Sequence, residues 1–286
     1  MCSSDLTPRT LILPLPSTAS MIPRMTPTLW IHLLPGSVDP DRLDGSVAVM
    51  IDVLRASTTL THALAAGCHS IRTCSDVDTA RHLASQAPPH DSPNDSLHRQ
   101  PPLLAGERGG TRIDGFDLDN SPSRFTPESV AGRTIVFTTT NGTKALESCR
   151  PAELVLVAAF CNMQAVIKTL LQLQQEVHLV CAGTDGQVTA EDCLCAGAIG
   201  LALRQHSGID THTCDATRIA IGLYQHLEQH LEQDPDGLLE AIRDSHGGRN
   251  LRRLGLDNDI ALAARRDSLD LVPTFNSHDN TISVLA

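Results

Sequence analysis

Acidic, basic and hydroxyl side chains gather where one apolar stretch of the sequence ends. Residues 47–51 read VAVMI, and Asp52, Arg55, Ser57 and Thr58 follow directly. A carboxylate can bind a magnesium ion, a guanidinium can hold a phosphate or a carboxylate, and hydroxyl groups can contact an anion. These residues therefore indicate an anion site, although Asp52 and Thr58 on their own could simply cap the next helix.

A second acid and base, Glu107 and Arg108, follow the short apolar stretch at residues 103–104. They open a long, polar, glycine-rich segment, AGERGGTRIDGFDLDNSPSRF, which we expect to be a loop. Long ordered loops often carry function. Glu107 could bind a metal ion and Arg108 an anion, or the two could form a surface salt bridge.

A third group of polar residues is the segment TTTNGTKAL, which follows the apolar residues 134–137. It places residues 138–142, which include Thr139, Thr140 and Asn141, in a tight turn before a helix that carries Lys144. Backbone N–H groups at a helix N-terminus bind anions, so the segment could form a phosphate cradle without the P-loop sequence. The alternative is an Asn-Gly turn with a threonine cap.

Two further acids, Glu191 and Asp192, lie in the first turn of a helix predicted from residue 190 to about residue 204. Negative charge is stabilised by the helix dipole at that position, which by itself explains both residues. Magnesium also prefers carboxylate oxygens, so a ligand role is the functional alternative. Asp257 and Asp259, further along, are expected to be caps or to support the site from behind.

Strand and helix patterns alternate along the chain and predict an α/β fold. We expect strands near residues 28–34, 47–51, 68–74, 103–104, 134–137, 154–158 and 177–182, most of them followed by a helix, and a turn at residues 246–248. Ligands of such folds bind at the carboxyl ends of the strands, where the four polar groups lie. Similar strand–loop–helix units recur in both halves of the chain, which suggests an internal duplication.

Composition limits the classes of function. The 286-residue chain has a formal charge of −11 and only 2% aromatic residues, which argues against nucleic-acid binding and favours a small polar ligand. No stretch resembles a membrane span. Nine scattered cysteines without a paired framework predict reduced thiols and a cytoplasmic location. The oligomeric state is open, and a homo-oligomer is compatible with the sequence.

Five segments in this order resemble the 2-phosphosulfolactate phosphatase family of coenzyme M biosynthesis: DVLRASTT, GERGGTRIDGFDLDNSP, TTTNGTKAL, AAFCN and AGTDGQVTAEDCLCAGAI. The resemblance covers about residues 28–275. It implies a three-layer α/β/α fold and magnesium-dependent hydrolysis of 2-phospho-3-sulfolactate to 3-sulfolactate and phosphate. One departure is Asp119, which stands where the family usually has glycine and adds a negative charge beside the suspected anion site.

Composition and the resemblance together indicate the organisation of the chain. Residues 28–286 are expected to form the phosphatase domain, and residues 88–102, which are rich in proline and poor in apolar residues, are expected to be a surface insertion. Residues 1–27 are expected to be a disordered extension or to follow an over-called start codon.

The resemblance implies a mechanism around one Mg²⁺ ion. Asp52, Glu107 and Asp192 are the expected ligands, with Glu191 as the substitute. Two groups of residues would bind the small anionic phosphorylated substrate. The phosphate would meet Arg55, Ser57, Thr58, Arg108, Thr139, Thr140, Asn141 and Lys144, and the sulfonate or carboxylate would meet Arg112 or Arg124.

Water is the simplest nucleophile for this reaction. Direct attack by Asp52 is the alternative, although Leu54 occupies the position of the second acid in a D-x-D pair. Two rival functions remain: a phosphatase for another small phosphorylated hydroxy acid, and a non-catalytic anion-binding protein.

Overall fold

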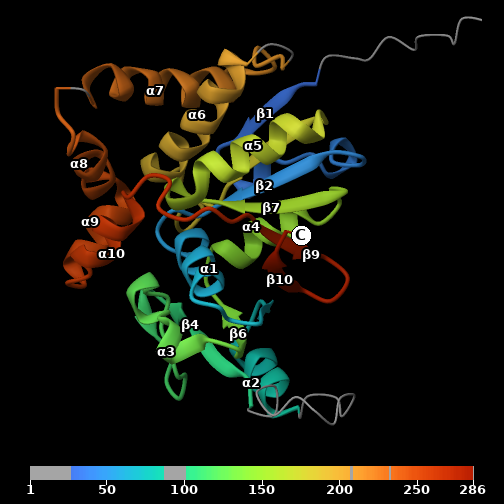
Figure 1. The fold of residues 1–286 in the computed structure, drawn as a ribbon, viewed down its shortest axis with the longest axis vertical. Helices are drawn as coiled ribbons and strands as arrows, with labels where there is room; N and C mark the ends of the chain where they lie inside the picture. The colour runs from blue at the N-terminus through green and yellow to red at the C-terminus, as the bar shows by residue number, and fades with distance from the viewer. Residues whose placement is uncertain (1–26, 87–100, 207–208, 232, 286) are drawn as a thin grey trace, which may run out of the picture.

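A computed structural model of the chain describes residues 27–86, 101–206, 209–231 and 233–285. The predicted N-terminal extension, residues 1–27, and the predicted insertion, residues 88–102, lie almost wholly outside the described residues. Helices flank a ten-stranded mixed sheet, so the predicted three-layer α/β/α fold is confirmed (Figure 1).

Two groups of parallel strands make up most of the sheet. The first group comprises, in spatial order, β1 (Leu29–His32), β8 (Val177–Cys181), β2 (Val47–Ile51) and β7 (Leu154–Ala158). The second comprises β3 (Ser70–Thr73), β6 (Thr134–Thr138) and β4 (Leu103–Arg108). Each group mixes strands from distant parts of the chain, and the suggested duplication stays a prediction.

A C-terminal hairpin joins the two parallel groups. Its strands are β9 (Pro273–Asn276) and β10 (Thr281–Val284), and they pair antiparallel with β7 on one side and with β3 on the other. The last residues of the chain therefore lie in the middle of the sheet and connect its halves. A short strand, β5 (Thr111–Arg112), completes the far edge by pairing antiparallel with β4.

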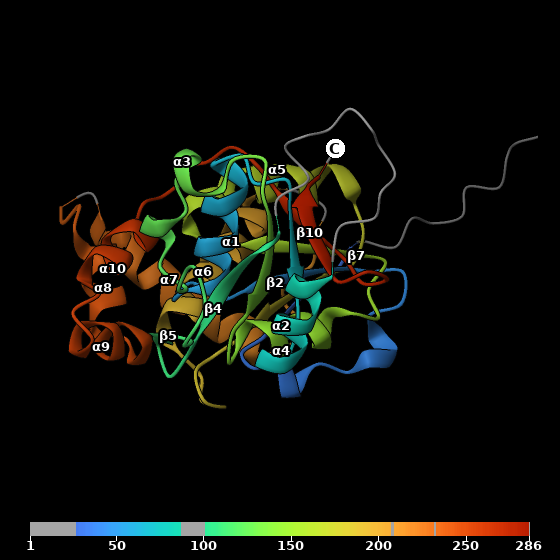
Figure 2. The same ribbon diagram turned by 90° about the horizontal axis from the view of Figure 1, so that it is seen from below.

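The helices follow the strands closely along the chain. Their bounds are α1 (Ala56–Ala65), α2 (Val77–Ser85), α3 (Pro127–Val130), α4 (Gly142–Cys149), α5 (Met163–Leu173), α6 (Ala190–Gln205), α7 (Asp215–Leu231), α8 (Gly237–Asp244), α9 (His246–Arg253) and α10 (Asp257–Ala263). Helices α8, α9 and α10 gather at one end of the molecule in both ribbon views (Figures 1 and 2).

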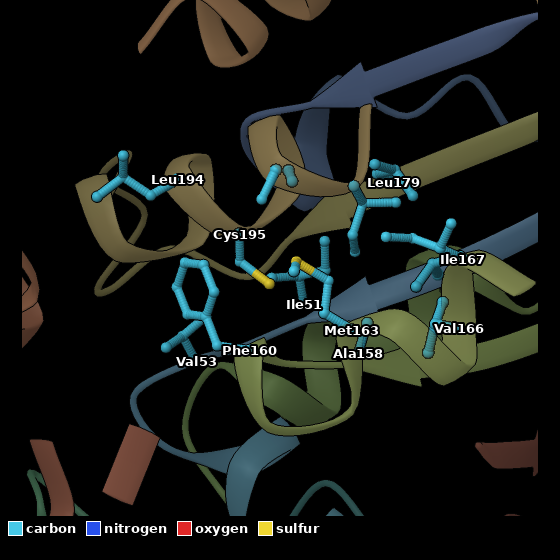
Figure 3. Packing of buried hydrophobic residues seen from close by; sticks show 14 of the residues in the cluster. Ile51, Val53, Ala158, Phe160, Met163, Val166, Ile167, Leu179, Leu194 and Cys195 are labelled. Carbon is cyan, nitrogen blue, oxygen red and sulfur yellow. The ribbon is translucent and has the colours of Figure 1, made fainter. Parts of the chain in front are cut away.

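Strand β2 is buried on both faces, which explains why its sequence is apolar throughout. Val49 and Ile51 point into a core that includes Phe160 of the β7–α5 connection and Cys195 of α6 (Figure 3). Met50 points to the other face, where α1 and α4 supply the core. Because its side chains alternate between the two faces, β2 packs against a helical layer on each side of the sheet.

Two predictions of local structure were wrong. The strand predicted at residues 103–104 continues to Arg108 and turns into a hairpin with β5, so Glu107 and Arg108 lie on a strand. The turn predicted at residues 246–248 is the start of α9, where the Ser245 hydroxyl accepts a hydrogen bond from Gly248 N at 3.0 Å. Glycine disfavours helices by local propensity, but packing against neighbouring chain leaves no room for a side chain at Gly247 or Gly248.

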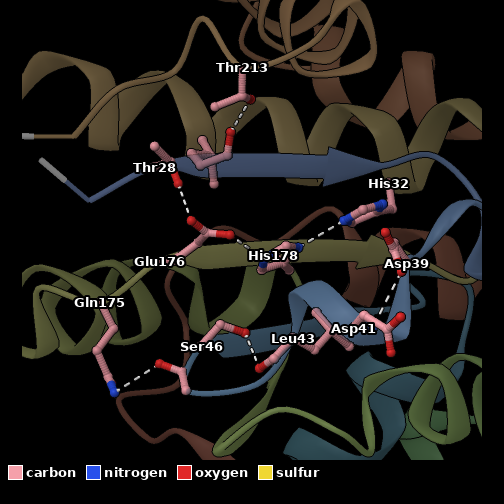
Figure 4. Close-up of polar contacts among 12 residues, drawn as sticks. Thr28, His32, Asp39, Asp41, Leu43, Ser46, Gln175, Glu176, His178 and Thr213 are labelled. Atoms are coloured by element: carbon pink, nitrogen blue, oxygen red, sulfur yellow. Dashed lines mark hydrogen bonds and ion pairs between the residues drawn. The ribbon is translucent and has the colours of Figure 1, made fainter. Parts of the chain in front are cut away.

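A polar chain crosses the paired strands β1 and β8 at the edge of the sheet (Figure 4). His32 Nδ1 lies 3.2 Å from Ser37 O, and His32 Nε2 lies 3.0 Å from His178 Nδ1. His178 Nε2 in turn lies 3.0 Å from Glu176 Oε1. These contacts satisfy two partly or fully buried rings, and none of the side chains lines the cavity described next.

Candidate active site

A cavity of about 360 Å³ opens where β2, β4 and β6 end. Asp52 follows β2, Glu107 lies near the end of β4, and Thr139, Thr140 and Asn141 follow β6. Helix α9 forms the opposite wall. The structure therefore brings together three of the four polar groups that the sequence singled out, at the carboxyl ends of parallel strands.

Asp52 is a buried carboxylate whose surroundings disfavour its charged form. Its Oδ1 accepts a hydrogen bond from Ala56 N at 3.2 Å. A Cβ atom built on Gly142 would lie 2.9 Å from Asp52 Oδ2, so only glycine lets the N-terminus of α4 approach this closely. Burial, together with the charges of Glu107 and Glu191, raises the pKa of Asp52 to about 7 against the opposing effects of the Ala56 N–H and Arg55.

Arg55 is held by residues far apart in the sequence. Its Nη1 donates to Asp259 Oδ2 at 2.8 Å in a buried ion pair, and its Nη2 donates to Gly110 O at 2.8 Å. The Ser121 hydroxyl donates to the other oxygen of Asp259 at 2.5 Å. Arg55 still lines the cavity, but with two of its donors committed it is a rigid part of the wall.

Glu107 and Arg108 point to opposite sides because they are neighbours on a strand. Glu107 lines the cavity, where its Oε1 accepts from Thr140 N at 2.9 Å and its Oε2 accepts from Gly110 N at 2.7 Å. Arg108 donates to the Thr138 hydroxyl at 2.9 Å and does not line the cavity. Glu107 therefore links the β4–β5 turn to the turn after β6.

The turn after β6 offers uncommitted donors to the cavity. The hydroxyl oxygens of Thr139 and Thr140 are buried and have no hydrogen-bond partner among the described residues. Asn141 Oδ1 accepts from Asp185 N at 3.3 Å. Lys144, three residues further on in the first turn of α4, is exposed and lies outside the cavity lining. Unpaired buried hydroxyl groups are costly, so these two threonines mark a place where a ligand would supply the missing partner.

Glu191 and Asp192, adjacent in sequence, have different surroundings. Asp192 accepts from Val53 N at 2.8 Å through Oδ1 and from Gly183 N at 2.9 Å through Oδ2, so it joins the loops after β2 and β8. Glu191 Oε2 is buried without a partner, and burial raises the pKa of Glu191. Glu191 Oε1 lies against the Gly247 backbone of α9.

These contacts bear on which carboxylates could hold a metal ion. No cluster of three or more His, Cys, Asp or Glu side chains suited to a metal occurs in the described part of the chain. Glu107 and Asp192 use both oxygens to accept backbone N–H groups, whereas Asp52 Oδ2 and Glu191 Oε2 accept no hydrogen bond from described residues. Two carboxylates suit Mg²⁺ when water and a substrate phosphate complete the octahedron.

Ser57 and Thr58, predicted to bind substrate, are fully buried on α1 and do not line the cavity. The Ser57 hydroxyl accepts from Asp52 N at 2.9 Å. The Thr58 hydroxyl donates to Val53 O at 2.8 Å. Both hydroxyl groups therefore shape the loop that carries Asp52.

Arg112 and Arg124, predicted to meet a sulfonate or carboxylate, lie together in a second cavity of about 330 Å³. Both are exposed, and Asp119 lines the same cavity. Asp119 Oδ1 accepts from Ser121 N at 2.9 Å. The negative charge that replaces the usual glycine therefore lies beside these two arginines and away from Asp52.

Sequence reasoning missed a set of cavity residues. They are Asn120, Thr184, Asp185, Gly247, Asn250, Leu251, Arg253 and Leu254. Asn120 and the Thr184–Asp185 pair stand inside segments already quoted as motifs, which was a usable signal. The residues of α9 had none, because a Gly-Gly sequence reads locally as a turn.

Comparison with known proteins gives the family. The sequence profile described as 2-phosphosulpholactate phosphatase matches residues 32–278. The chain belongs to the 2-phosphosulfolactate phosphatase family. A probable 2-phosphosulfolactate phosphatase of Synechococcus sp. (strain RCC307) is 41% identical over 244 residues, 82% of this chain and 93% of the relative. A protein with the same name from Microcystis aeruginosa is 36% identical, and the match covers 88% of this chain and 92% of the relative. Another from Caldanaerobacter subterraneus subsp. tengcongensis is 35% identical, and the match covers 83% of this chain and 90% of the relative.

The match to the 2-phosphosulfolactate phosphatase family spans every element of the cavity, from β2 to α9. The resemblance stated from sequence is thereby confirmed. Among the described residues, no helix has the length and apolar character needed to cross a membrane.

Proposed function

We propose that the protein is a magnesium-dependent phosphatase that hydrolyses 2-phospho-3-sulfolactate to 3-sulfolactate and inorganic phosphate. The family supports the substrate, because the relatives carry that name. One feature of the cavity supports the chemistry: Asp52, which has an oxygen without a hydrogen bond, lines it together with Thr139 and Thr140, whose buried hydroxyl groups have no partner among the described residues.

Mg²⁺ would be held by Asp52, which lines the cavity, and by Glu191, which lies just outside the lining against Gly247; each has an oxygen that accepts no hydrogen bond from described residues. Bound there, the ion would neutralise charge on the phosphate and polarise its oxygens. Glu107 and Asp192 are better suited to hold the surrounding loops, since their oxygens already accept backbone N–H groups.

The remaining residues would bind and orient the phosphate. The hydroxyl groups of Thr139 and Thr140 can donate to its oxygens, and the N-terminal end of α4 adds a favourable dipole. Arg55 presents its uncommitted N–H groups without having to move, because Asp259 and Gly110 fix its guanidinium. Preorganised donors of this kind stabilise the charge that develops on the phosphoryl group.

Water attacks the phosphorus, the bond from phosphorus to the ester oxygen breaks, and the hydroxy acid leaves with a proton. A covalent aspartyl phosphate on Asp52 is the alternative route. Rapid-quench kinetics with enzyme at substrate-like concentration separate them. Attack by water releases the hydroxy acid and phosphate together, whereas an aspartyl phosphate that accumulates releases the hydroxy acid in a burst ahead of phosphate.

The function is tested by measuring phosphate release from 2-phospho-3-sulfolactate, phosphoglycolate, 2-phospholactate and para-nitrophenyl phosphate, each with Mg²⁺ and with EDTA. We expect 2-phospho-3-sulfolactate to be hydrolysed best, and only with Mg²⁺. Preference for another hydroxy-acid phosphate would change the substrate assigned to the enzyme. Activity that is unchanged in EDTA would refute the requirement for Mg²⁺. No hydrolysis of any compound would leave an anion-binding protein as the account.

A further inference from the structure

Helix α9 presents one face to the cavity. Gly247, Asn250, Leu251 and Leu254 recur at helical spacing, and all four line the cavity together with Arg253. The same cavity is lined by Asp52 and by the turn after β6. The cavity therefore has one wall of carboxylate and hydroxyl groups and another wall formed by a helix.

The position of α9 is fixed at both ends. At its start, Gly247 packs so closely that a Cβ atom there would lie 2.1 Å from Glu191 Oε1. At its end, Leu254 packs against the β4–β5 turn, where a Cβ atom on Gly110 would lie 2.6 Å from Leu254 Cδ1. Side chains on this helix are thus held at a set distance from the proposed phosphate site.

The charges of the lining residues are unbalanced between the two walls. Asp52, Glu107 and Asp185 are the lining acids, and Arg55 and Arg253 are the lining bases. Arg55 is neutralised by its buried ion pair with Asp259. Arg253 is exposed and makes no ion pair or side-chain hydrogen bond with any residue in the described part of the chain, so its full charge is available to a ligand.

We propose that Arg253, with the Asn250 amide beside it, binds the second acid group of the substrate, a sulfonate or a carboxylate. This inference rests on the proposed function, which sets the phosphate at the strand ends. A planar guanidinium suits either group, and the amide can donate one further hydrogen bond. Arg253 is then a specificity residue, because it recognises the end of the substrate that does not react.

This assignment differs from the one drawn from sequence, which used Arg112 or Arg124. Those two arginines line the second cavity with Asp119 and do not line the cavity of Asp52. 2-Phospho-3-sulfolactate carries its carboxylate and its sulfonate within a few bonds of the phosphate, so all three groups need to be met inside one cavity. Among the described residues that line this cavity, Arg253 is the one base without an acidic partner.

The test compares Arg253→Gln with Arg252→Gln in the magnesium-loaded enzyme. Arg252 is the matched control because it is exposed on the same helix, lies 3.8 Å from Asp257 and does not line the cavity. The substrates are 2-phospho-3-sulfolactate, with both acid groups, 2-phospholactate, with a carboxylate alone, and para-nitrophenyl phosphate, with neither. Thermal unfolding of both variants checks that they are folded.

We expect Arg253→Gln to lower kcat/KM for 2-phospho-3-sulfolactate by about tenfold to 100-fold, as for a lost hydrogen bond to a charged group. Hydrolysis of para-nitrophenyl phosphate should stay within twofold of the wild type, and Arg252→Gln should leave all substrates unchanged. A loss shared by 2-phospholactate assigns Arg253 to the carboxylate, and a loss confined to 2-phospho-3-sulfolactate assigns it to the sulfonate.

Product inhibition gives a second readout. In Arg253→Gln the inhibition constant of 3-sulfolactate should rise, while that of inorganic phosphate should not. Equal losses on all substrates, or no loss on 2-phospho-3-sulfolactate, would overturn the role of Arg253. Either result leaves the proposed function standing, because that function is judged on the wild-type enzyme alone, by its substrate preference and its need for Mg²⁺.

Discussion

Replacing Asp52 with asparagine should stabilise the fold while it abolishes activity. Burial and the neighbouring acids raise the pKa of Asp52 from 3.8 to about 7. The folded state therefore binds this proton more tightly than the unfolded state does, and stability is lost as pH rises from about 4 to about 7. The difference between the two pKa values corresponds to a loss of folding free energy of at most about 4 kcal/mol at pH 8.

Asp52→Asn removes this penalty and keeps an oxygen that can accept from Ala56 N. In EDTA at pH 8 we expect the free energy of unfolding to rise by up to about 4 kcal/mol, or the midpoint of thermal unfolding by roughly 8 °C. At pH 5 the gain should fall to less than half. Urea denaturation at the two pH values measures both effects.

Asp192→Asn is the matched comparison. Asp192 is equally buried, but both of its oxygens accept backbone N–H groups, from Val53 and Gly183. An asparagine would turn an N–H group toward one of those donors, at a cost of about 1–3 kcal/mol. Burial and the charges of Glu191 and Asp52 also raise the pKa of Asp192, so Asp192→Asn removes a charge penalty as well, and the lost acceptor reduces the resulting gain in stability at pH 8. If Asp52→Asn is no more stable than wild type at pH 8, the reasoning about its charge is refuted.

Three further predictions concern packing and the sheet edge. Gly142→Ala should lower both kcat and the unfolding midpoint, because the new Cβ would lie 2.9 Å from Asp52 Oδ2; normal kinetics would contradict this close approach. Gly197→Ala should cost about 1–3 kcal/mol by pushing α6 from the backbone of α7, whereas Gly222→Ala, with open space around it, should gain about 0.5–1 kcal/mol; urea denaturation tests both signs. Burial, and then the charge of His178, lower the pKa of His32 from 6.5 to about 4, so the stability of the protein should fall as the pH drops from 6.5 to 4. The stability of His32→Gln should fall less over the same range, and equal losses in both proteins would refute the prediction.

Strand and helix positions were predictable where local pattern and packing agree. The apolar residues of β2 and the capping residue Asp76 of α2 correctly predicted that strand and that helix. Burial on both faces requires apolar residues throughout, and a helix cap requires a residue such as aspartate, so both can be recognised in the sequence. The carboxyl ends of parallel strands then had to share one edge, which correctly brought Asp52, Glu107 and the turn after β6 into one cavity.

Contacts between distant residues were not predictable. From the sequence, Arg55 was predicted to be free to bind an anion. Only the fold brings Asp259, 204 residues away, close enough to neutralise its charge. Arg108 follows Glu107, and the direction of each depends on β4 continuing to that point.

The sequence by itself determined the family, the α/β class and the polar groups at the strand ends. Each of these depends on residue types and on spacing within a short segment. Tertiary structure alone decided which carboxylates keep a free oxygen, and it places Arg253 in the lining of the Asp52 cavity and Arg112 and Arg124 in the lining of a second one. The physical reason is that free hydrogen-bonding capacity and unpaired charge depend on partners, and those partners come from far along the chain.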